Sequence, residues 1–302
     1  MLKNNSFWDF YWETRLQPME NLGKRAAILS ASRLIRSLSE QKPHPLRLLE
    51  LGCGEGQVIG TLLDAHSQVC SIRESVGVDY NPVSITNCRR DFPGMTCVQG
   101  DFTKAELLNS LGKFDLVILV NALHEVFSDS FSPELGEVDV PVAKQNVETA
   151  FARAVNCISP GGWVVLFDGL EPSGDPNRNV SVRFYDERGF LNFNSFVQQY
   201  HPFKITYGKT SDPFVVTLSQ RDFTRYITKS IFLGKQLWKT EQLESYQYFT
   251  EEEFDKLFSL QELKIKEFRK LTMNEGKWHD VVEILTPEYT FPDEHILILA
   301  QK

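Results

Sequence analysis

The feature that most constrains the fold of this chain is the run from Leu48 to Gly56, Leu-Leu-Glu-Leu-Gly-Cys-Gly-Glu-Gly. An apolar stretch leads into three glycines on alternate positions, and apolar residues at helical spacing follow from Val58 to Leu63. This pattern predicts a buried strand, a tight turn and a helix, the first unit of a nucleotide-binding α/β sheet. Glycines permit positive φ and let a ligand lie against bare backbone, while the following helix offers unpaired N–H groups.

Two other nucleotide-binding turns fit this run less well. A Rossmann dehydrogenase would have Gly-x-Gly-x-x-Gly, whereas the third glycine here comes one position early. A phosphate-binding P-loop would need Gly-Lys followed by Ser or Thr, and this stretch has no such sequence. The spacing therefore separates this turn from both classes.

Three further predicted strands end close to polar side chains. Val76 to Asp79 ends in an acid, Met95 to Phe102 ends in Asp-Phe, and Phe114 to Val120 is followed by Asn121. An acid at the end of the second strand can accept both ribose hydroxyls of an adenosine. The sequence alone leaves open that Asp79 is a solvated loop acid.

Taken together, these motifs make Leu46 to Leu170 and the C-terminal part of the chain resemble the class I S-adenosylmethionine-dependent methyltransferases, whose first motif is acid-x-Gly-x-Gly-x-Gly. The resemblance implies an α/β fold with a seven-stranded, mostly parallel sheet, helices on both faces and an antiparallel last strand. It also implies S-adenosyl-L-methionine as cofactor and methyl transfer by direct displacement. The motifs are specific for the cofactor and carry no information about the acceptor.

The resemblance further implies a cofactor site at the ends of the first four strands. The first motif lies around the methionine end, the second strand's end binds ribose and adenine, the third binds the adenine edge, and the fourth faces the methionyl group. In that order the matching residues are Glu50, Gly52, Gly54 and Gly56; Asp79 and Tyr80; Asp101 and Phe102; and Asn121 and Ala122. The interval from Glu50 to Asp79 exceeds the roughly twenty residues of a compact βαβ unit. A longer loop between the first helix and the second strand explains it.

His124 and Glu125 are the catalytic candidates. They follow the fourth strand at its C-terminal end, where ligands bind in open α/β sheets. A neutral imidazole at His124 can accept a proton from a hydroxyl acceptor, and Glu125 is the second candidate base. The sequence equally allows His124 to begin a helix or shape the acceptor site. The other histidines show no metal-ligand spacing, so no metal is expected.

The sequence divides into four segments. Residues 1–42 are predicted to form an N-terminal helical lid, 43–171 the cofactor-binding core, and 246–302 the C-terminal part of the core sheet. Residues 172–245 are too long for a simple loop after the fifth strand. We therefore expect a mostly helical insertion there that serves as a substrate-binding lid.

A small, partly apolar molecule is the expected acceptor. The net charge of −8 and the pI near 5.4 disfavour a surface built to bind a phosphate backbone. Aromatic and basic side chains in the first and third segments are candidates to contact the acceptor, although they could equally pack a helix or the insertion's own core. These candidates are Tyr11, Trp12, Arg15, Phe184, Tyr185 and Tyr226.

Two other function classes remain open from the sequence. Basic residues interleaved with aromatics can bind single-stranded nucleic acid, so the acceptor could be RNA or protein instead. The basic residues of the insertion are Arg183, Arg188, Arg221, Arg225, Lys229 and Lys235. The chain could also be a cofactor-binding subunit without catalysis.

The cysteines and the termini suggest a location. Five cysteines, an odd number, occur without a Cys-x-x-Cys pair, and the sequence shows neither a secretory leader nor a run of membrane-spanning length. These features predict a cytoplasmic protein with reduced thiols, bound neither to nucleic acid nor to a membrane. A monomer or a homodimer is expected.

Overall fold

The central feature of the computed structural model is a large twisted sheet. The structure describes residues 22–66, 68–273 and 275–302, and within them seven strands pair in the order β11-β13-β7-β4-β1-β2-β3. All pairs are parallel except those of β13, which runs antiparallel to both β11 and β7. The predicted mostly parallel sheet with an antiparallel last strand is therefore confirmed. The strands are β1 (Leu46–Leu51), β2 (Ile72–Asp79), β3 (Thr96–Gln99), β4 (Phe114–Val120), β7 (Ile158–Gly169), β11 (Lys264–Leu271) and β13 (His295–Gln301).

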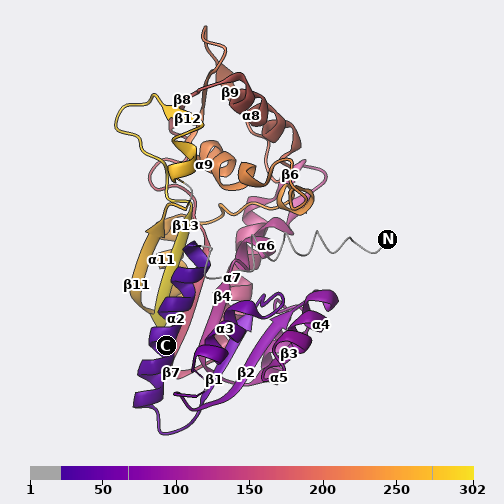
Figure 1. The fold of residues 1–302 in the computed structure, drawn as a ribbon, viewed down its shortest axis with the longest axis vertical. Helices are drawn as coiled ribbons and strands as arrows, with labels where there is room; N and C mark the ends of the chain where they lie inside the picture. Colours follow the sequence, from indigo (N-terminus) through magenta and orange to yellow (C-terminus); the bar gives the residue numbers. More distant parts are fainter. Residues whose placement is uncertain (1–21, 67, 274) are drawn as a thin grey trace.

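Helices cover both faces of this sheet (Figure 1). Successive residues of a strand point to opposite faces, so Leu116 packs with α2 and α3 while Val117 packs with α7. All seven residues of β4 are buried, as a central parallel strand requires. The helices of one face are α2 (Leu22–Gln41), α3 (Gln57–His66) and α4 (Pro82–Asp91), and those of the other are α5 (Ala105–Leu111), α7 (Val140–Asn156) and α11 (Glu251–Leu260).

Helix α2 lies against the sheet. Ile28, Ile35 and Leu38 are buried, whereas Leu29 is 51% exposed. Residues 1–21, and with them Tyr11, Trp12 and Arg15 of the predicted lid, lie outside the described residues. No helix in the described part of the chain is long and apolar enough to cross a membrane.

The segment after β4 forms regular elements. It forms α6 (Leu123–Ser128) and a short hairpin of β5 (Phe131–Ser132) and β6 (Glu137–Val138). The side chain of Asp168, at the end of β7, accepts a hydrogen bond from the backbone N of Leu123 at 2.8 Å. A carboxylate at a helix N-terminus stabilises the helix, and because this one comes from a distant strand, local sequence gives no sign of it.

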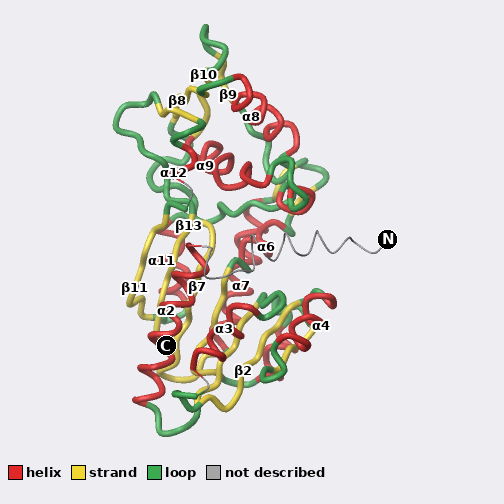
Figure 2. Tube along the Cα trace, viewed as in Figure 1, coloured by secondary structure: helices red, strands yellow, loops and turns green. Residues whose placement is uncertain are grey.

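The insertion after β7 also needs correction, because it is not mostly helical. Four strands form a second sheet in the order β12-β8-β10-β9, beside helices α8 and α9 (Figure 2). Val180, Val182 and Phe184 are buried at alternate positions of β8, which is the two-residue period of a strand. The strands are β8 (Asn179–Phe184), β9 (Tyr207–Lys209), β10 (Val215–Ser219) and β12 (Val282–Ile284); the helices are α8 (Glu187–Gln199), α9 (Gln220–Lys229), η2 (Ser230–Phe232), α10 (Trp238–Glu241) and α12 (Glu275–Trp278).

Strand β12 comes from the C-terminal segment, which the sequence analysis assigns to the core sheet. It pairs with β8 in antiparallel register, with Val282 opposite Phe184. The chain thus returns to the second sheet after β11 and before β13. Three residues of strand are too short to be recognised in the sequence, and only their partner strand shows where they belong.

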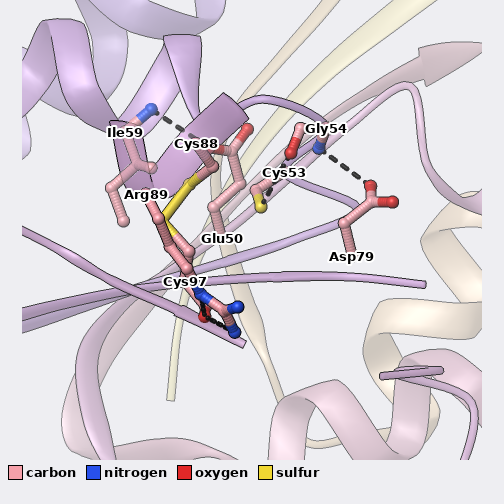
Figure 3. The surroundings of a disulfide bond; sticks show 8 residues. All are labelled: Glu50, Cys53, Gly54, Ile59, Asp79, Cys88, Arg89 and Cys97. Carbon is pink, nitrogen blue, oxygen red and sulfur yellow. Dashed lines mark hydrogen bonds between the residues drawn. A yellow bond between two sulfur atoms is a disulfide. The ribbon is translucent and has the colours of Figure 1, made fainter. Parts of the chain in front are cut away.

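A disulfide joins Cys88 of α4 to Cys97 of β3 (Figure 3), which contradicts the expectation that all thiols are reduced. The other three cysteines, Cys53, Cys70 and Cys157, are free and buried. The disulfide lies behind the glycine turn, where a Cβ on Gly56 would come within 2.8 Å of Cys88 Sγ. The cross-link therefore packs directly against the glycine turn at Gly56.

Reducing this disulfide should lower the free energy of unfolding by roughly 2–3 kcal/mol, because the cross-link restricts a short loop of the unfolded chain. Urea denaturation with and without a thiol reductant measures the difference. The double variant Cys88→Ser, Cys97→Ser serves as the control, since its stability should not respond to reductant. If reductant lowered the free energy of unfolding equally in the wild type and the double variant, the loss of stability would come from groups other than this disulfide.

Candidate active site

A cavity of about 540 Å³ opens at the C-terminal ends of β1, β2 and β4. This is the edge of a parallel sheet where ligands bind in open α/β folds. Most of the residues that the sequence analysis selects as site residues line it. They are Glu50, Gly52, Gly54, Asp79, Tyr80, Asp101, Phe102, Asn121, Ala122, His124 and Glu125.

The glycine turn presents bare backbone to this cavity. Gly54 has φ +53°, and a Cβ built there would meet no atom within 4 Å, so the space beside it belongs to the cavity. Gly56 has φ +82° and does not line the cavity. Its lack of a side chain makes room for Cys88 Sγ, so the expected contact of Gly56 with the cofactor is replaced by a packing role.

Asp79 holds the turn in place. Its Oδ2 accepts a hydrogen bond from the backbone N of Gly54 and its Oδ1 one from the backbone N of Asn81, both at 2.8 Å. Burial raises the pKa of this carboxyl, and the two backbone hydrogen bonds partly offset the effect. Each oxygen of a carboxylate can accept more than one hydrogen bond, so Asp79 retains capacity for the hydroxyls of a ribose.

Replacing Asp79 with alanine should weaken cofactor binding by one to two orders of magnitude, roughly 1.4–2.8 kcal/mol, because both ribose hydroxyls lose a charged acceptor. Calorimetric titration with S-adenosyl-L-methionine measures the loss. A melting curve of the variant shows whether the turn survives without its two backbone hydrogen bonds. Unchanged affinity would remove Asp79 from the cofactor site.

Glu50 is a buried acid at the end of β1, 2% exposed, whose Oε2 accepts a hydrogen bond from the backbone N of Ile59 at 3.0 Å (Figure 3). Burial raises the pKa of Glu50 to about 8, against the opposing effects of that hydrogen bond and of Lys24. The acid is therefore neutral at pH 7 in the free protein. A ligand that brings positive charge to the cavity would favour its ionised form.

The raised pKa of Glu50 predicts that it destabilises the folded chain at alkaline pH. From its ordinary pKa of 4.5 up to about 8, the unfolded chain is ionised at this residue while the folded chain keeps the proton. The free energy of unfolding therefore falls as pH rises through this range. Glu50→Gln should gain roughly 2–4 kcal/mol over wild type at pH 8 and little at pH 5. Urea denaturation at both pH values tests this, with the exposed Asp255→Asn as the charge control.

His124 is held in one orientation by Asp168. Its Nδ1 lies 2.7 Å from Asp168 Oδ1, and because a carboxylate only accepts, Nδ1 carries the proton and Nε2 holds the lone pair of the neutral ring. Burial opposes protonation of His124, but Asp168 and Glu244 outweigh it and raise the pKa of the imidazole. His124 Nε2 is buried without a hydrogen-bond partner. The pair thus has the geometry of an oriented base.

Charged and aromatic side chains from the segment after β10 surround this histidine. The ring of Tyr246 packs against it at an interplanar angle of 30°, with centroids 4.0 Å apart, and Glu244 Oε2 lies 3.7 Å from Nε2. The ammonium of Lys229 lies 3.2 Å from Glu244 Oε2, 2.7 Å from Glu241 Oε2 and 3.9 Å from the Tyr246 ring centroid. Lys229 and Glu241 are fully buried, so this cluster is part of the folded core next to the cavity.

Sequence reasoning missed Asp168 and Glu244. Asp168 ends the fifth strand, and polar residues at strand ends had already been used to select Asp79 and Asn121, so the same signal would have found it. Glu244 carries no such signal, because it lies in an irregular stretch between α10 and α11. Only the folded chain brings it to His124.

The aromatic residues proposed for the acceptor do not reach the cavity. Phe184 and Tyr226 are 1% exposed and pack edge to face on each other in the core of the second sheet, with ring centroids 6.0 Å apart. Tyr185 is 56% exposed and does not line the cavity either. The structure therefore does not bring these three residues to the cavity. The physical reason is that an insertion of this size needs aromatic side chains for its own core.

Within the described residues, no group of three or more His, Cys, Asp or Glu side chains could hold a metal ion. The cavity instead has features that suit S-adenosyl-L-methionine. Gly54 leaves open space beside its backbone, Asp79 has acceptor capacity to spare, and the Oδ1 of Asn121 is buried with no partner at the cavity. Asn121 also has φ +54°, a conformation that asparagine tolerates better than most residues.

Comparison with known proteins gives one family. Residues 49–166 match the family described as Methyltransferase domain. A non-reducing polyketide synthase from Penicillium brasilianum is 27% identical over 114 residues, which make up 36% of this chain. The chain spans only 5% of the length of that curated relative.

Two solved structures are among those matched by this chain. An S-adenosylmethionine-dependent methyltransferase from Clostridium acetobutylicum is 13% identical with a TM-score of 0.48, covering 98% of each chain. The N-methyltransferase NodS from Bradyrhizobium japonicum, in complex with S-adenosyl-L-homocysteine, is 10% identical with a TM-score of 0.44, covering 99% of each chain. The family match spans the glycine turn and the strands that end at the cavity, so residues 49–166 contain a methyltransferase domain, and with the seven-stranded sheet this match supports S-adenosyl-L-methionine as the cofactor.

Proposed function

We propose that this methyltransferase transfers its methyl group to a small-molecule acceptor, at oxygen or nitrogen, with His124 as the general base. The observation that carries the proposal is the Nε2 of His124, which is buried without a partner in a ring that lines the cavity. Asp168 fixes the tautomer that leaves this atom able to accept a proton. Glu125 lines the same cavity and is the second candidate base.

Each group of the site has a part in the proposed reaction. Glu50, Asp79, Asp101 and Asn121, together with the glycine turn, would bind the cofactor, which supplies an electrophilic methyl group when bound. Alignment of the acceptor and exclusion of water can supply much of the rate enhancement. His124 would take the acceptor's proton, and Asp168 would stabilise the imidazolium that results.

A macromolecular acceptor is the second candidate, and the charges of the insertion argue against it. Arg221 pairs with Glu171 at 3.0 Å, Arg225 with Asp222 at 3.1 Å, and Lys229 is fully buried. Arg183 pairs with Asp212 and Glu283. Basic side chains that are already neutralised release few counterions when nucleic acid binds, so this surface favours a small acceptor over RNA.

The same proposal includes the surroundings of the site. The segment 172–245 would cover the acceptor side, and the N-terminal segment 1–42 would form a lid over the cofactor, with Tyr11, Trp12 and Arg15 among the residues outside the described structure. We also propose a cytoplasmic enzyme acting as a monomer or homodimer. Alkylation and mass spectrometry of the protein from cells would measure how much of the Cys88–Cys97 pair is oxidised there.

The test of the acceptor class uses a cell extract divided into small molecules, RNA and protein, each incubated with methyl-labelled cofactor and the enzyme. We expect label in the small-molecule fraction and a labelled product identifiable by mass spectrometry. Label only in RNA or protein would overturn the proposal in favour of the second candidate. Cofactor binding without label in any fraction would point to a subunit without catalysis.

A further inference from the structure

Helix α4 links two parts of the candidate cofactor site. Its N-cap residue, Asn81, lines the cavity and donates its backbone N–H to Asp79 Oδ1 at 2.8 Å. Further along the same helix, Asn87 donates from Nδ2 to Oε1 of Glu55, inside the glycine turn, at 2.7 Å. Glu55 is buried, and a hydrogen bond shielded from water holds its partners firmly. A shift of α4 would therefore move both the acid at the end of β2 and the glycine turn.

The disulfide fixes α4 to strand β3 (Figure 3). Cys88 and Cys97 are both buried, and a Cβ on Gly56 would lie only 2.8 Å from Cys88 Sγ. The cross-link is thus in contact with the glycine turn itself. Beyond Cys97 the chain leads to Asp101, which lines the cavity. One covalent bond therefore joins the helix that supports the turn to the strand that leads to the expected adenine-binding residues.

The reduced chain keeps a second connection between the same two elements. Arg89, the neighbour of Cys88, donates from two guanidinium nitrogens to the carbonyl oxygen of Cys97 at 3.1 and 2.9 Å (Figure 3). These hydrogen bonds do not involve the sulfur atoms, so α4 remains on β3 after reduction. Strand β3 lies at the edge of the described sheet, beside β2. An edge strand opens locally at lower cost than a central one, and such opening gives a reductant access to the buried sulfurs.

We propose that the Cys88–Cys97 pair is a redox switch that sets the affinity for S-adenosyl-L-methionine, with the tighter binding in the disulfide form. This inference rests on the cofactor site and is independent of the acceptor. A dithiol supplies two electrons and two protons: the S–S bond breaks, Cys88 and Cys97 become thiols, and the dithiol becomes a disulfide.

Reduction acts on the cofactor through the position of the turn. The two sulfurs, no longer bonded, move apart, and Cys88 Sγ is the atom that packs against Gly56. The glycine turn and α4 then lose their fixed relative position, although the hydrogen bonds of Asn87 and Arg89 keep them in the fold. The apparent affinity falls in proportion to the fraction of molecules whose turn is in the binding conformation.

The test is calorimetric titration with S-adenosyl-L-methionine of the oxidised protein and of protein reduced with dithiothreitol, at a temperature where melting curves show both to be folded. We expect the Kd to rise about tenfold on reduction and to return when oxidised glutathione restores the disulfide. Equal Kd values, or a rise that reoxidation does not reverse, would overturn the switch. A reduced protein that is unfolded at every temperature would overturn it too, because the cross-link would then be needed for the fold. An oxidised protein that does not bind would overturn the cofactor site together with the switch.

Two variants identify the cysteines responsible. The double variant Cys88→Ser, Cys97→Ser should bind the cofactor with the Kd of the reduced wild type, whether or not dithiothreitol is present. Cys53 is a free cysteine that lines the cavity, so a change at its thiol is the competing explanation. Cys53→Ala should keep the ratio of the reduced to the oxidised Kd that the wild type shows. A ratio that persists in the double variant, or disappears in Cys53→Ala, would overturn the assignment to the disulfide.

Discussion

Replacing His124 with alanine should lower the rate constant of methyl transfer by roughly 10²–10⁴-fold, the usual contribution of a general base. Cofactor affinity should stay nearly unchanged, because the bonds of Asp79 to Gly54 and Asn81 do not involve this histidine. Single-turnover measurements with saturating cofactor give the rate constant. A variant that mainly raises the acceptor's KM would instead show that His124 only shapes the site.

The pH profile supplies the independent test of this role. The rate should fall as pH falls through the pKa of His124, because a protonated imidazole cannot accept the proton of the acceptor. Asp168 and Glu244 raise this pKa above the ordinary 6.5, so the acidic limb should lie above pH 6.5 in the wild type. Burial, together with His124 and Lys229, lowers the pKa of the neighbouring His295 to about 4, so His295 does not titrate in this range. The limb should be absent in His124→Ala.

Asp168→Asn provides the matched variant for that profile. Asparagine keeps an oxygen near the backbone N of Leu123, which Asp168 Oδ2 bonds at 2.8 Å, so α6 retains an N-terminal partner. The negative charge that raises the pKa of His124 is lost, so the acidic limb should move to lower pH. The rate at its plateau should also fall, because the amide no longer fixes the histidine tautomer. If the acidic limb of the pH profile stayed at the same pH in Asp168→Asn, a group other than His124 would be responsible for it.

Replacing Gly54 with valine should abolish binding of S-adenosyl-L-methionine. The residue has φ +53° and faces open space of the cavity, so a branched side chain would occupy the ligand's volume and meet a conformational penalty as well. Calorimetric titration should show no detectable binding. A melting curve of the variant must show that it is folded. Lost binding can then be attributed to the blocked site and not to unfolding.

Gly136→Val is the control that separates these two effects. Gly136 has φ +69° and open space around its Cβ position, in the turn between β5 and β6, and it does not line the cavity. Valine there should lower the stability through the same backbone penalty while binding stays normal. If Gly54→Val bound the cofactor as well as Gly136→Val does, the glycine turn would not be the cofactor-binding turn.

The core sheet and the cofactor end of the cavity could be predicted from local sequence. Parallel strands buried on both faces read as continuous apolar runs, as in Phe114–Val120, and the glycines and acids that follow such runs must lie at one edge of the sheet. This reasoning predicts that Glu50, Gly54, Asp79 and Asn121 lie close together, and all four line the same cavity. The one glycine of the motif that does not line the cavity, Gly56, is constrained by packing on Cys88.

The acceptor end was decided only by tertiary structure. Asp168 starts α6 from a strand more than forty residues away, Glu244 and Tyr246 reach His124 from an irregular stretch beyond the second sheet, and β12 joins that sheet from the far end of the chain. In the sequence each of these residues looks like an ordinary strand end or loop residue. Their roles depend on burial and on the charges around them, and both arise only when distant segments pack together. Local pattern therefore determined which residues after the first four strands line the cavity, and long-range packing determined the charged surroundings of His124.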